Sequence, residues 1–389
     1  MTEPFPAAAL ILRAPDGRVL VSRRTVETPF LGGFVAFVGG KLGVGDDARA
    51  ARWFGADTPE HRARAAAVRE LLEETGLLLH ASGLVRVERG TDPDVALEGR
   101  GLSPPRAEAM PSVGRWITPA HLPLRFDTLF FLVDVPEPVR AEPDPRELSW
   151  ADFRAPRTIL DGHRALEHLL PRPTQRQLAA LLEPSPLAAL RRAAGDDEGE
   201  FEPMSGIWQV PLRTPTLPPA THTNCYVLGV ERAVVVDPAT YEDAERARLG
   251  RLLDRLVASG TEPSAVVLTH HHRDHVGSAR WVAERHRIPV LAHPVTRDLL
   301  EGEVAVDGLL DDGDELDLGR DATGEPFRLR CLHTPGHAAG HLVLADLRRG
   351  VRSLVVGDMV AAVGTIIVDP DEGHMGTYIQ QLERLRRSF

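Results

Sequence analysis

Alternating hydrophobic and polar positions divide the first part of the chain into short strands and one long helix. A helix is predicted from Thr58-Pro59, where threonine caps and proline opens the first turn, to Thr75, followed by Gly76 as a stop. The segment Leu42–Asp57 lacks a clear period, and we predict that it is an inserted loop. Short apolar runs around the turn signal Pro15-Asp16-Gly17 predict a hairpin and a third strand, at Ala7–Arg13, Val19–Ser22 and Phe34–Val38.

A charged stretch and a new set of apolar runs indicate a second domain. Gly195-Asp196-Asp197-Glu198-Gly199-Glu200 contains no apolar residue, which is typical of an exposed linker. Beyond it, leucines at helical spacing predict a helix over Glu242–Ala258. Strands are predicted at Ile207–Leu212, Thr223–Leu228, Ala233–Asp237, Ala265–Leu268 and Phe327–Cys331. We therefore predict two domains, residues 1–194 and 206–389, joined by a linker at residues 195–205.

The composition is that of a globular protein, and it narrows the range of partners. Hydrophobic residues make up 43% of the chain and charged residues 26%. The formal net charge of -11 disfavours broad electrostatic binding to nucleic acid or to an anionic membrane. The two cysteines, Cys225 and Cys331, lie in apolar runs, which predicts buried thiols in a reducing compartment. Because Ala7–Leu12 is too short to span a membrane, we expect a cytoplasmic protein; the sequence leaves the oligomeric state open.

Three glutamates share one face of the predicted helix. Glu70, Glu73 and Glu74 follow the i, i+3, i+4 spacing, so their carboxylates repel one another unless a cation neutralises them. Oxygen ligands of this kind suit magnesium. Arg69 lies four residues before Glu73 and is placed to orient it by an ion pair. A solvated acidic helix face is the alternative interpretation.

The stretch Arg69-Glu70-Leu71-Leu72-Glu73-Glu74-Thr75-Gly76-Leu77 resembles the second half of the Nudix box. The resemblance implies an α/β/α sandwich with a mixed sheet that cleaves a diphosphate linkage. It also implies that Glu70, Glu73 and Glu74 hold Mg²⁺ or Mn²⁺, and that a glutamate of this cluster acts as the catalytic base. Trp116-Ile117-Thr118-Pro119 and Arg125–Phe131 resemble the coenzyme A diphosphatase subgroup. Glu147 is either a further metal-binding carboxylate or an exposed glutamate at a strand start.

The first half of the box departs from the family pattern. Between Gly40 and Arg69 the chain has about 15 residues more than that pattern, and we assign the excess to the inserted loop. His61 stands at the register position of the first glutamate of the box, and Asp46 and Asp47 are other candidates for its role.

A second candidate metal site lies in Thr269-His270-His271-His272-Arg273-Asp274-His275, directly after a predicted strand. Imidazole and carboxylate groups are preferred ligands of zinc-like cations, and loops at strand ends commonly carry catalytic groups. His270 and His272 are two residues apart and can point the same way from an extended segment. Asp274 and His275 lie a short turn beyond and can address a second cation.

This stretch is followed along the chain by Thr334-Pro335-Gly336-His337 and then by Asp358 at a strand end. That order of motifs resembles the metallo-β-lactamase superfamily over roughly residues 206–389. The resemblance implies an αβ/βα sandwich with two Zn²⁺ ions. His270, His272 and His337 would hold one ion; Asp274, also a catalytic residue, and His275 would hold the other, with Asp358 bridging. His271 and His341 match no ligand position. The family's final histidine, in a Pro-x-His-Gly turn, is expected beyond Phe389, or else the second ion lacks that ligand.

Together the two resemblances imply a bifunctional metallohydrolase that acts on small molecules. The Nudix part would hydrolyse a nucleoside diphosphate linkage, coenzyme A-like or related. The second part would hydrolyse a thioester or ester by metal-bound hydroxide. The alternative is a zinc-dependent endoribonuclease or phosphodiesterase whose Nudix part is a nucleotide-binding regulatory module. The acidic charge and the lack of basic clusters disfavour nucleic acid as a partner.

Overall fold

The chain divides into two units, Met1–Asp197 and Glu198–Phe389. The computed structural model describes residues 3–119, 122, 124–194, 199–351, 353–361 and 364–389. The predicted linker lies partly outside these residues; within it, β10 (Phe201–Met204) pairs with the strand that follows. Among the described residues, no helix is long and apolar enough to cross a lipid bilayer.

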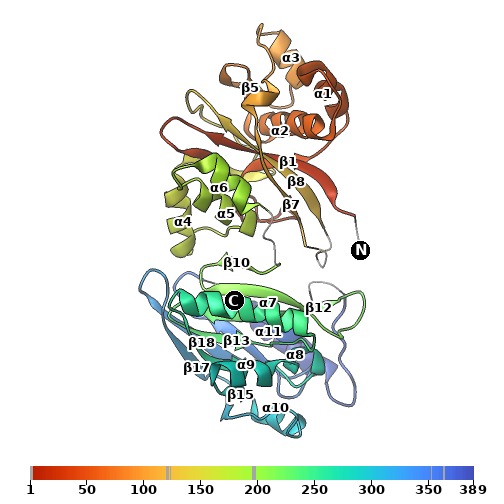
Figure 1. The fold of residues 1–389 in the computed structure, drawn as a ribbon. Coiled ribbons are helices and arrows are strands. Elements are labelled where there is room, and N and C mark those ends of the chain that lie inside the picture. Colours follow the sequence, from red (N-terminus) through yellow and green to blue (C-terminus); the bar gives the residue numbers. More distant parts are fainter. Residues whose placement is uncertain (1–2, 120–121, 123, 195–198, 352, 362–363) are drawn as a thin grey trace. The chain divides into compact units, whose positions relative to one another are not determined.

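A mixed seven-stranded sheet runs through the first unit (Figure 1). Its order is β3-β2-β1-β8-β7, with β4 also paired to β1 and β9 to β2. β1 and β8 are parallel, whereas β1 pairs with β2 and β4 in antiparallel fashion, which confirms the predicted hairpin. The strands are β1 (Phe5–Arg13), β2 (Val19–Arg24), β3 (Val35–Ala36), β4 (Val38–Lys41), β7 (Ser112–Ile117), β8 (Phe126–Asp134) and β9 (Leu148–Arg154), beside a separate hairpin of β5 (Leu77–His80) and β6 (Gly83–Arg86).

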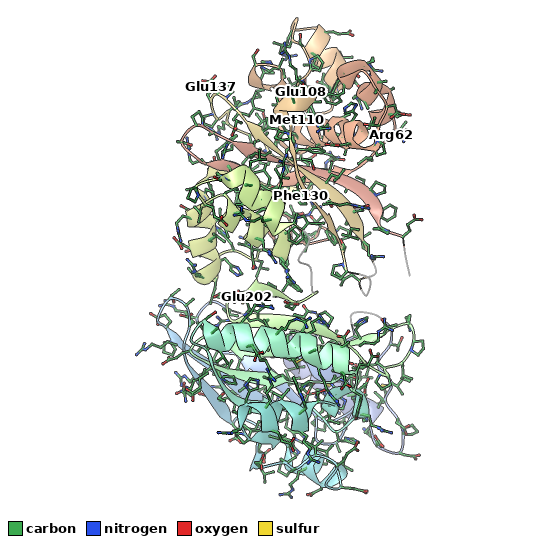
Figure 2. The ribbon with its side chains drawn as sticks, in the orientation of Figure 1. Arg62, Glu108, Met110, Phe130, Glu137 and Glu202 are labelled. Atoms are coloured by element: carbon green, nitrogen blue, oxygen red, sulfur yellow. The ribbon has the colours of Figure 1, made fainter. Side chains whose placement is uncertain are left out.

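Successive residues of β1 face two different helical layers, because side chains alternate across a strand. Leu10 belongs to a buried cluster that includes residues of α2 (Pro59–Thr75), and Ile11 belongs to a second cluster on the opposite face. Met110 lies in the first cluster and Phe130 in the second (Figure 2). The second layer consists of α4 (Pro156–Arg164), α5 (Arg172–Ala180) and α6 (Pro186–Ala193). The predicted α/β/α sandwich is therefore confirmed.

Helix α2 begins and ends where the sequence predicts. Thr58 Oγ1 accepts a hydrogen bond from the backbone N–H of His61 at 3.1 Å, which caps the first turn. Gly76 ends the helix with a φ of 66°, a conformation that glycine adopts without strain.

The inserted segment is not the loop that its sequence predicts. Helix α1 (Asp46–Phe54) runs through it between two glycines of positive φ, Gly45 and Gly55. Its buried residues are Asp46, Arg49 and Ala50, so the face that it turns inward is largely charged. The prediction was wrong because α1 is short and two of its three buried residues are charged, which leaves Ala50 and the half-buried Trp53 and Phe54 as a weak apolar signal.

Two sheets pack face to face in the second unit (Figure 1). In the larger sheet the strands follow chain order, antiparallel as far as β13 and parallel from β13 to β16. Its strands after β10 are β11 (Ile207–Arg213), β12 (His222–Gly229), β13 (Arg232–Val236), β14 (Glu262–Val267), β15 (Val290–Ala292) and β16 (Gly308–Leu309). The smaller, antiparallel sheet contains β17 (Glu315–Arg320), β18 (Pro326–His333), β19 (Leu342–Asp346) and β20 (Leu354–Val355).

Helices cover the outer faces of both sheets. Val235 belongs to a cluster with α7 (Asp243–Ala258) and α9 (Ala279–His286), while its neighbour Val234 packs between the sheets with Cys331. α11 (Met375–Ser388) packs on the other side of the smaller sheet. The predicted αβ/βα sandwich is confirmed, and both cysteines are free and buried, as expected.

Candidate metal centres

The parallel strands of the larger sheet bring polar residues to one edge. Asp237 follows β13, and the histidine-rich stretch follows β14, leading into the short helix α8 (Arg273–Val276). His337 follows β18 and Asp358 follows β20 of the facing sheet. Because parallel strands present their carboxyl ends at the same edge, residues distant in sequence meet there.

Three histidine nitrogens converge at this edge. His272 Nδ1 lies 3.1 Å from His270 Nε2 and 3.0 Å from His337 Nε2. Burial, together with the neighbouring histidines, lowers the pKa of His270 well below its usual value, so the ring is neutral. The structure thus brings together the three residues predicted to bind the first ion, with ligand atoms close enough to share a cation.

The second nitrogen of each of these rings is bonded to an oxygen. The pairs are His270 Nδ1 with Thr269 Oγ1 at 3.0 Å, His272 Nε2 with Glu372 Oε2 at 3.1 Å, and His337 Nδ1 with the Ile367 carbonyl at 2.7 Å. A proton held at that nitrogen leaves the lone pair on the converging nitrogen. The outer contacts therefore select the tautomer that a cation needs.

His275 and Asp358 form a second group next to the first. His275 Nε2 lies 3.3 Å from Asp358 Oδ1, and Asp358 Oδ2 lies 3.5 Å from His337 Nε2, so Asp358 spans the two groups. His275 Nδ1 donates to Asp237 Oδ2 at 2.8 Å. Burial lowers the pKa of His275, but Asp237 and Asp358 outweigh it and raise this pKa well above its usual value. Asp274 lies beside His275 on α8, and its role as a ligand stays a prediction.

His341 contacts the backbone of Asp358. The backbone N–H of Asp358 donates to His341 Nε2 at 3.2 Å, so His341 carries its proton on Nδ1 and donates it to Thr334 Oγ1 at 2.8 Å. Burial lowers the pKa of His341 to about 3, which keeps the ring neutral. Gly357 has a φ of 48°, and a Cβ there would lie 2.6 Å from His341 Nε2. This contact accounts for a histidine that matches no ligand position.

Sequence reasoning missed Glu372, which orients His272. The two residues are 100 positions apart, and Glu372 lies in a turn-rich acidic segment with no periodic pattern. No local signal marks it, because only the tertiary fold brings it to the histidine.

A further group, His293, Asp311 and His333, lies at other strand ends. The rings of His293 and His333 are stacked, with centroids 4.1 Å apart and planes 12° from parallel. Lone pairs lie in the ring plane, so two stacked rings do not aim at a common ion. His293 Nδ1 also accepts a hydrogen bond from the backbone of Val295 at the start of α10 (Pro294–Leu299). We therefore interpret this group as structural.

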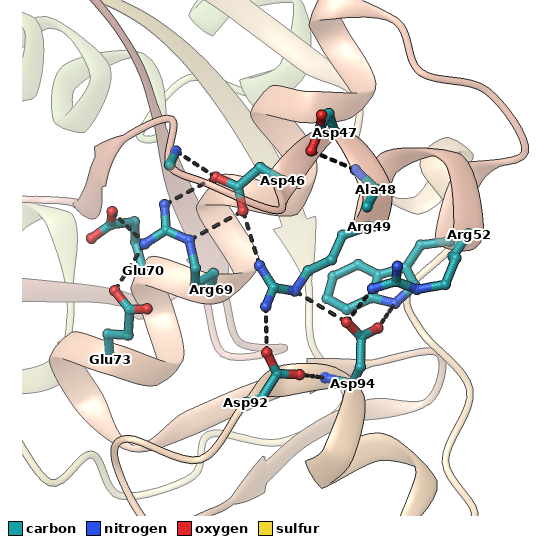
Figure 3. Close-up of polar contacts among 12 residues, drawn as sticks. Asp46, Asp47, Ala48, Arg49, Arg52, Arg69, Glu70, Glu73, Asp92 and Asp94 are labelled. Carbon is teal, nitrogen blue, oxygen red and sulfur yellow. Dashed lines mark hydrogen bonds and ion pairs between the residues drawn. The ribbon is translucent and has the colours of Figure 1, made fainter.

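In the first unit, Arg69 holds two of the predicted carboxylates (Figure 3). Its Nη1 lies 2.8 Å from Glu70 Oε1 and 2.8 Å from Glu73 Oε2, which confirms the predicted ion pair between Arg69 and Glu73. A Cβ at Gly40 would lie 2.5 Å from Glu70 Cδ, so the glycine leaves room for this carboxylate.

Glu70 and Glu74 sit where a negative charge is costly. Burial raises the pKa of Glu70 to about 7, although Arg69 opposes the shift. Burial, followed by the charge of Glu70, raises the pKa of Glu74 to about 8. The charge of Glu147 adds to the rise in the pKa of both groups. A divalent cation among these oxygens would relieve both the burial and the repulsion.

His61 lies apart from this cluster. His61 Nδ1 contacts the Ala56 carbonyl at 2.8 Å, and the residue is nine positions, or about 13 Å of helix, before Glu70. The position that the spacing gives for the first glutamate of the box is therefore far from the other carboxylates.

The two units are similar to different known proteins. Residues 218–389 match the family model described as Metallo-beta-lactamase superfamily, so this part of the chain is a domain of that superfamily. A hydroxyacylglutathione hydrolase of Halorhodospira halophila is 37% identical over 123 residues, which are 31% of this chain and 43% of the relative. An uncharacterized protein of Mycobacterium tuberculosis is 33% identical over 149 residues, 32% of this chain and 61% of the relative.

A crystal structure of a NUDIX hydrolase from Alicyclobacillus acidocaldarius is 31% identical to this chain. The match covers 48% of this chain and 94% of the neighbour, with a TM-score of 0.42. The chain spans 61% of the length of the mycobacterial relative and 43% of the length of the Halorhodospira enzyme, so each match covers only part of the relative.

Proposed function

We propose that the protein is a metal-dependent hydrolase with two separate active sites for small-molecule substrates. The second unit would hydrolyse a thioester or ester, and the first unit would hydrolyse a nucleoside diphosphate linkage of the kind found in coenzyme A. The observation that carries this proposal is that His270, His272 and His337 of the second unit have ligand atoms close enough to share a cation. In the first unit it is supported by the buried glutamates, since burial and the charge of Glu73 raise the pKa of Glu70, and burial and the charge of Glu70 raise that of Glu74. These two donor sets suit different cations, zinc and magnesium or manganese.

In the second unit, His270, His272 and His337 would hold one Zn²⁺. His275 and Asp358, with Asp274, would hold the other. Bound zinc would lower the pKa of water toward about 7 and polarise the scissile carbonyl. The outer oxygens keep each imidazole in one tautomer, so the site needs no rearrangement to bind metal. Relatives named hydroxyacylglutathione hydrolase support an acyl conjugate as the substrate.

In the first unit, Glu70, Glu73 and Glu74 would hold Mg²⁺ or Mn²⁺. The cation would supply positive charge at the diphosphate oxygens, where charge develops during cleavage. A glutamate of the cluster would accept the proton of the attacking water. Arg69 would keep Glu70 and Glu73 turned toward the cation.

The test uses an acyl-coenzyme A, because it contains both scissile bonds. Full-length protein with Zn²⁺ and Mn²⁺ should release free thiol and also cut the diphosphate, as measured by mass spectrometry of the products. Glu73→Gln should lower only diphosphate cleavage, and His272→Ala only thiol release. Each loss should exceed about 100-fold, because outer partners of a metal alone cost about 10–100-fold.

His374→Ala is the matched control, since His374 is an exposed histidine of the same unit that caps α11. Both activities should survive this change. Acyl-coenzyme A that stays intact with the metal-loaded wild-type protein would contradict the proposal.

A further inference from the structure

Asp46 contacts the edge of the Arg69 guanidinium that faces away from Glu70 and Glu73. Arg69 Nε lies 3.1 Å from Asp46 Oδ1 and Arg69 Nη2 lies 3.0 Å from Asp46 Oδ2, a two-point contact in the plane of the guanidinium (Figure 3). Nη2 also donates to the Lys41 carbonyl at 2.8 Å. Two parallel bonds fix the orientation of the guanidinium as well as its position.

The carboxylate that makes this contact belongs to the inserted segment. The Asp46 side chain is 2% exposed. Its Oδ2 accepts a hydrogen bond from the backbone N–H of Gly43 at 2.8 Å, and its Oδ1 lies 3.2 Å from Arg49 Nη1. A buried carboxylate with this many donors has a single orientation, so it can serve as a fixed support.

The insertion is in turn anchored to a different part of the unit. Arg49 also contacts Asp92 and Asp94, which lie at the start of α3 (Pro93–Glu98). Asp94 accepts a further hydrogen bond from Trp53 Nε1 at 2.7 Å (Figure 3). A continuous set of ion pairs therefore runs from α3 through α1 to Arg69 and the glutamates of α2.

These contacts indicate which residue takes the place of the first glutamate of the box, which the family spacing assigns to His61. His61, at the register position of the first glutamate, bonds near the start of α2 and is far from Arg69. Asp46 has the charge, the burial and the two-point contact that a partner of Arg69 requires. Asp47, the neighbouring candidate, is exposed, and its side chain accepts a bond from the backbone of Ala48.

We propose that Asp46 is the positioning residue of the carboxylate site, and that the inserted helix completes this site by fixing Arg69. The proposal rests on the proposed metal site of the first unit. One Nη1 group serves both Glu70 and Glu73, so a rotation of the guanidinium would release both carboxylates together. Loss of Asp46 would therefore weaken cation binding without removing any ligand.

The experiment measures Mn²⁺ binding to the full-length, zinc-loaded protein by electron paramagnetic resonance of free Mn²⁺. Asp46→Asn keeps the size of the side chain and removes its charge, and we expect a rise in the Mn²⁺ dissociation constant of about 10–100-fold. Asp47→Asn, the matched control one residue away, should leave the dissociation constant within about twofold of wild type, the scale expected of an exposed surface change.

The number of Mn²⁺ ions bound per chain separates positioning from unfolding. Mispositioned ligands lower the affinity at unchanged stoichiometry, whereas partial unfolding lowers the stoichiometry and leaves the affinity of the remaining sites unchanged. The second pattern, or an unchanged affinity in Asp46→Asn, would overturn the role of Asp46. Mn²⁺ binding that is unchanged in the Glu73→Gln variant would instead overturn the proposed metal site itself.

Discussion

At the scale of single residues, the tautomer of each clustered histidine in the second unit is determined by the oxygen that its outer ring nitrogen contacts. His272 and His337 each bond an oxygen through one ring nitrogen and present the other to the shared centre. Because a neutral imidazole has one proton, the outer oxygen determines which nitrogen is free for a cation. The residues that support the ligands therefore matter nearly as much as the ligands themselves.

His341 should control the second cation through Asp358. In His341→Ala the backbone N–H of Asp358 loses its acceptor, so the carboxylate that spans the two groups is held less firmly. We expect the affinity for the second zinc ion to fall by about 10–100-fold. The first ion, bound by His270, His272 and His337, should keep its affinity. Isothermal titration with Zn²⁺ resolves the two events.

His341→Gln is the matched variant, because its side-chain carbonyl can accept the same N–H bond. It should recover most of the lost affinity. Equal zinc affinities in His341→Ala and wild type would show that the contact with Asp358 does not position the carboxylate.

The predicted site residues that the structure brings together are those that share a short pattern. His270 and His272 lie in one stretch, and Glu70 and Glu73 lie on one turn of helix, so spacing alone places each pair together. Asp46 was one of three candidates for the first glutamate of the box, and Glu372 was not predicted, because their contacts join distant segments. Their partners Arg69 and His272 are 23 and 100 positions away, and only the fold brings them into contact.

At the scale of elements, periodic patterns identified most strands and the long helices, whereas α1 was predicted as a loop. α2 and α7 present leucines to a core, so their apolar period is visible in the sequence. α1 packs Trp53 and Phe54 against the core, but it also buries Asp46 and Arg49, and Arg49 forms ion pairs with Asp92 and Asp94. Hydrophobic patterning detects the first kind of packing and not the second.

Arg49→Met should destabilise the first unit through α1. The Arg49 side chain is 9% exposed, and its removal leaves the buried carboxylate of Asp46 with one donor fewer. We expect a loss of about 2–4 kcal/mol in the free energy of unfolding, somewhat below the cost of breaking a fully buried pair because Asp92 is half-exposed. Urea unfolding followed by circular dichroism measures this loss.

Arg52→Met is the control on the same helix. Arg52 also pairs with Asp94, but its side chain is 55% exposed, so its loss should cost about 0–1 kcal/mol. Similar losses in both variants would contradict the view that the buried ion pairs hold α1 in place.

At the scale of the whole molecule, the cores of the two units are separate. The buried clusters of the first unit contain residues up to 193, and those of the second begin at 207. Each unit also has its own proposed ligands, imidazoles in one and carboxylates in the other. Metal binding should therefore stabilise one unit at a time.

Calorimetry of the full chain should show two unfolding transitions with different metal responses. Zinc at about 100 times its dissociation constant adds about 2.7 kcal/mol to the unit that binds it, a rise of about 5–10 °C in that transition. Mn²⁺ should raise the other transition. Glu73→Gln should abolish the Mn²⁺ shift alone. A single unfolding transition whose midpoint temperature rises with either metal would contradict the independence of the units.

The contact between Asp46 and Arg69 has a consequence for how such proteins are recognised. The partner of the arginine comes from the inserted segment, and a contact in space does not depend on a fixed number of residues between Gly40 and Arg69. A search that requires constant spacing between Gly40 and Arg69 would pass over any chain built in this way. A search that asks for a carboxylate in two-point contact with the arginine would find it, whatever the length of the intervening segment.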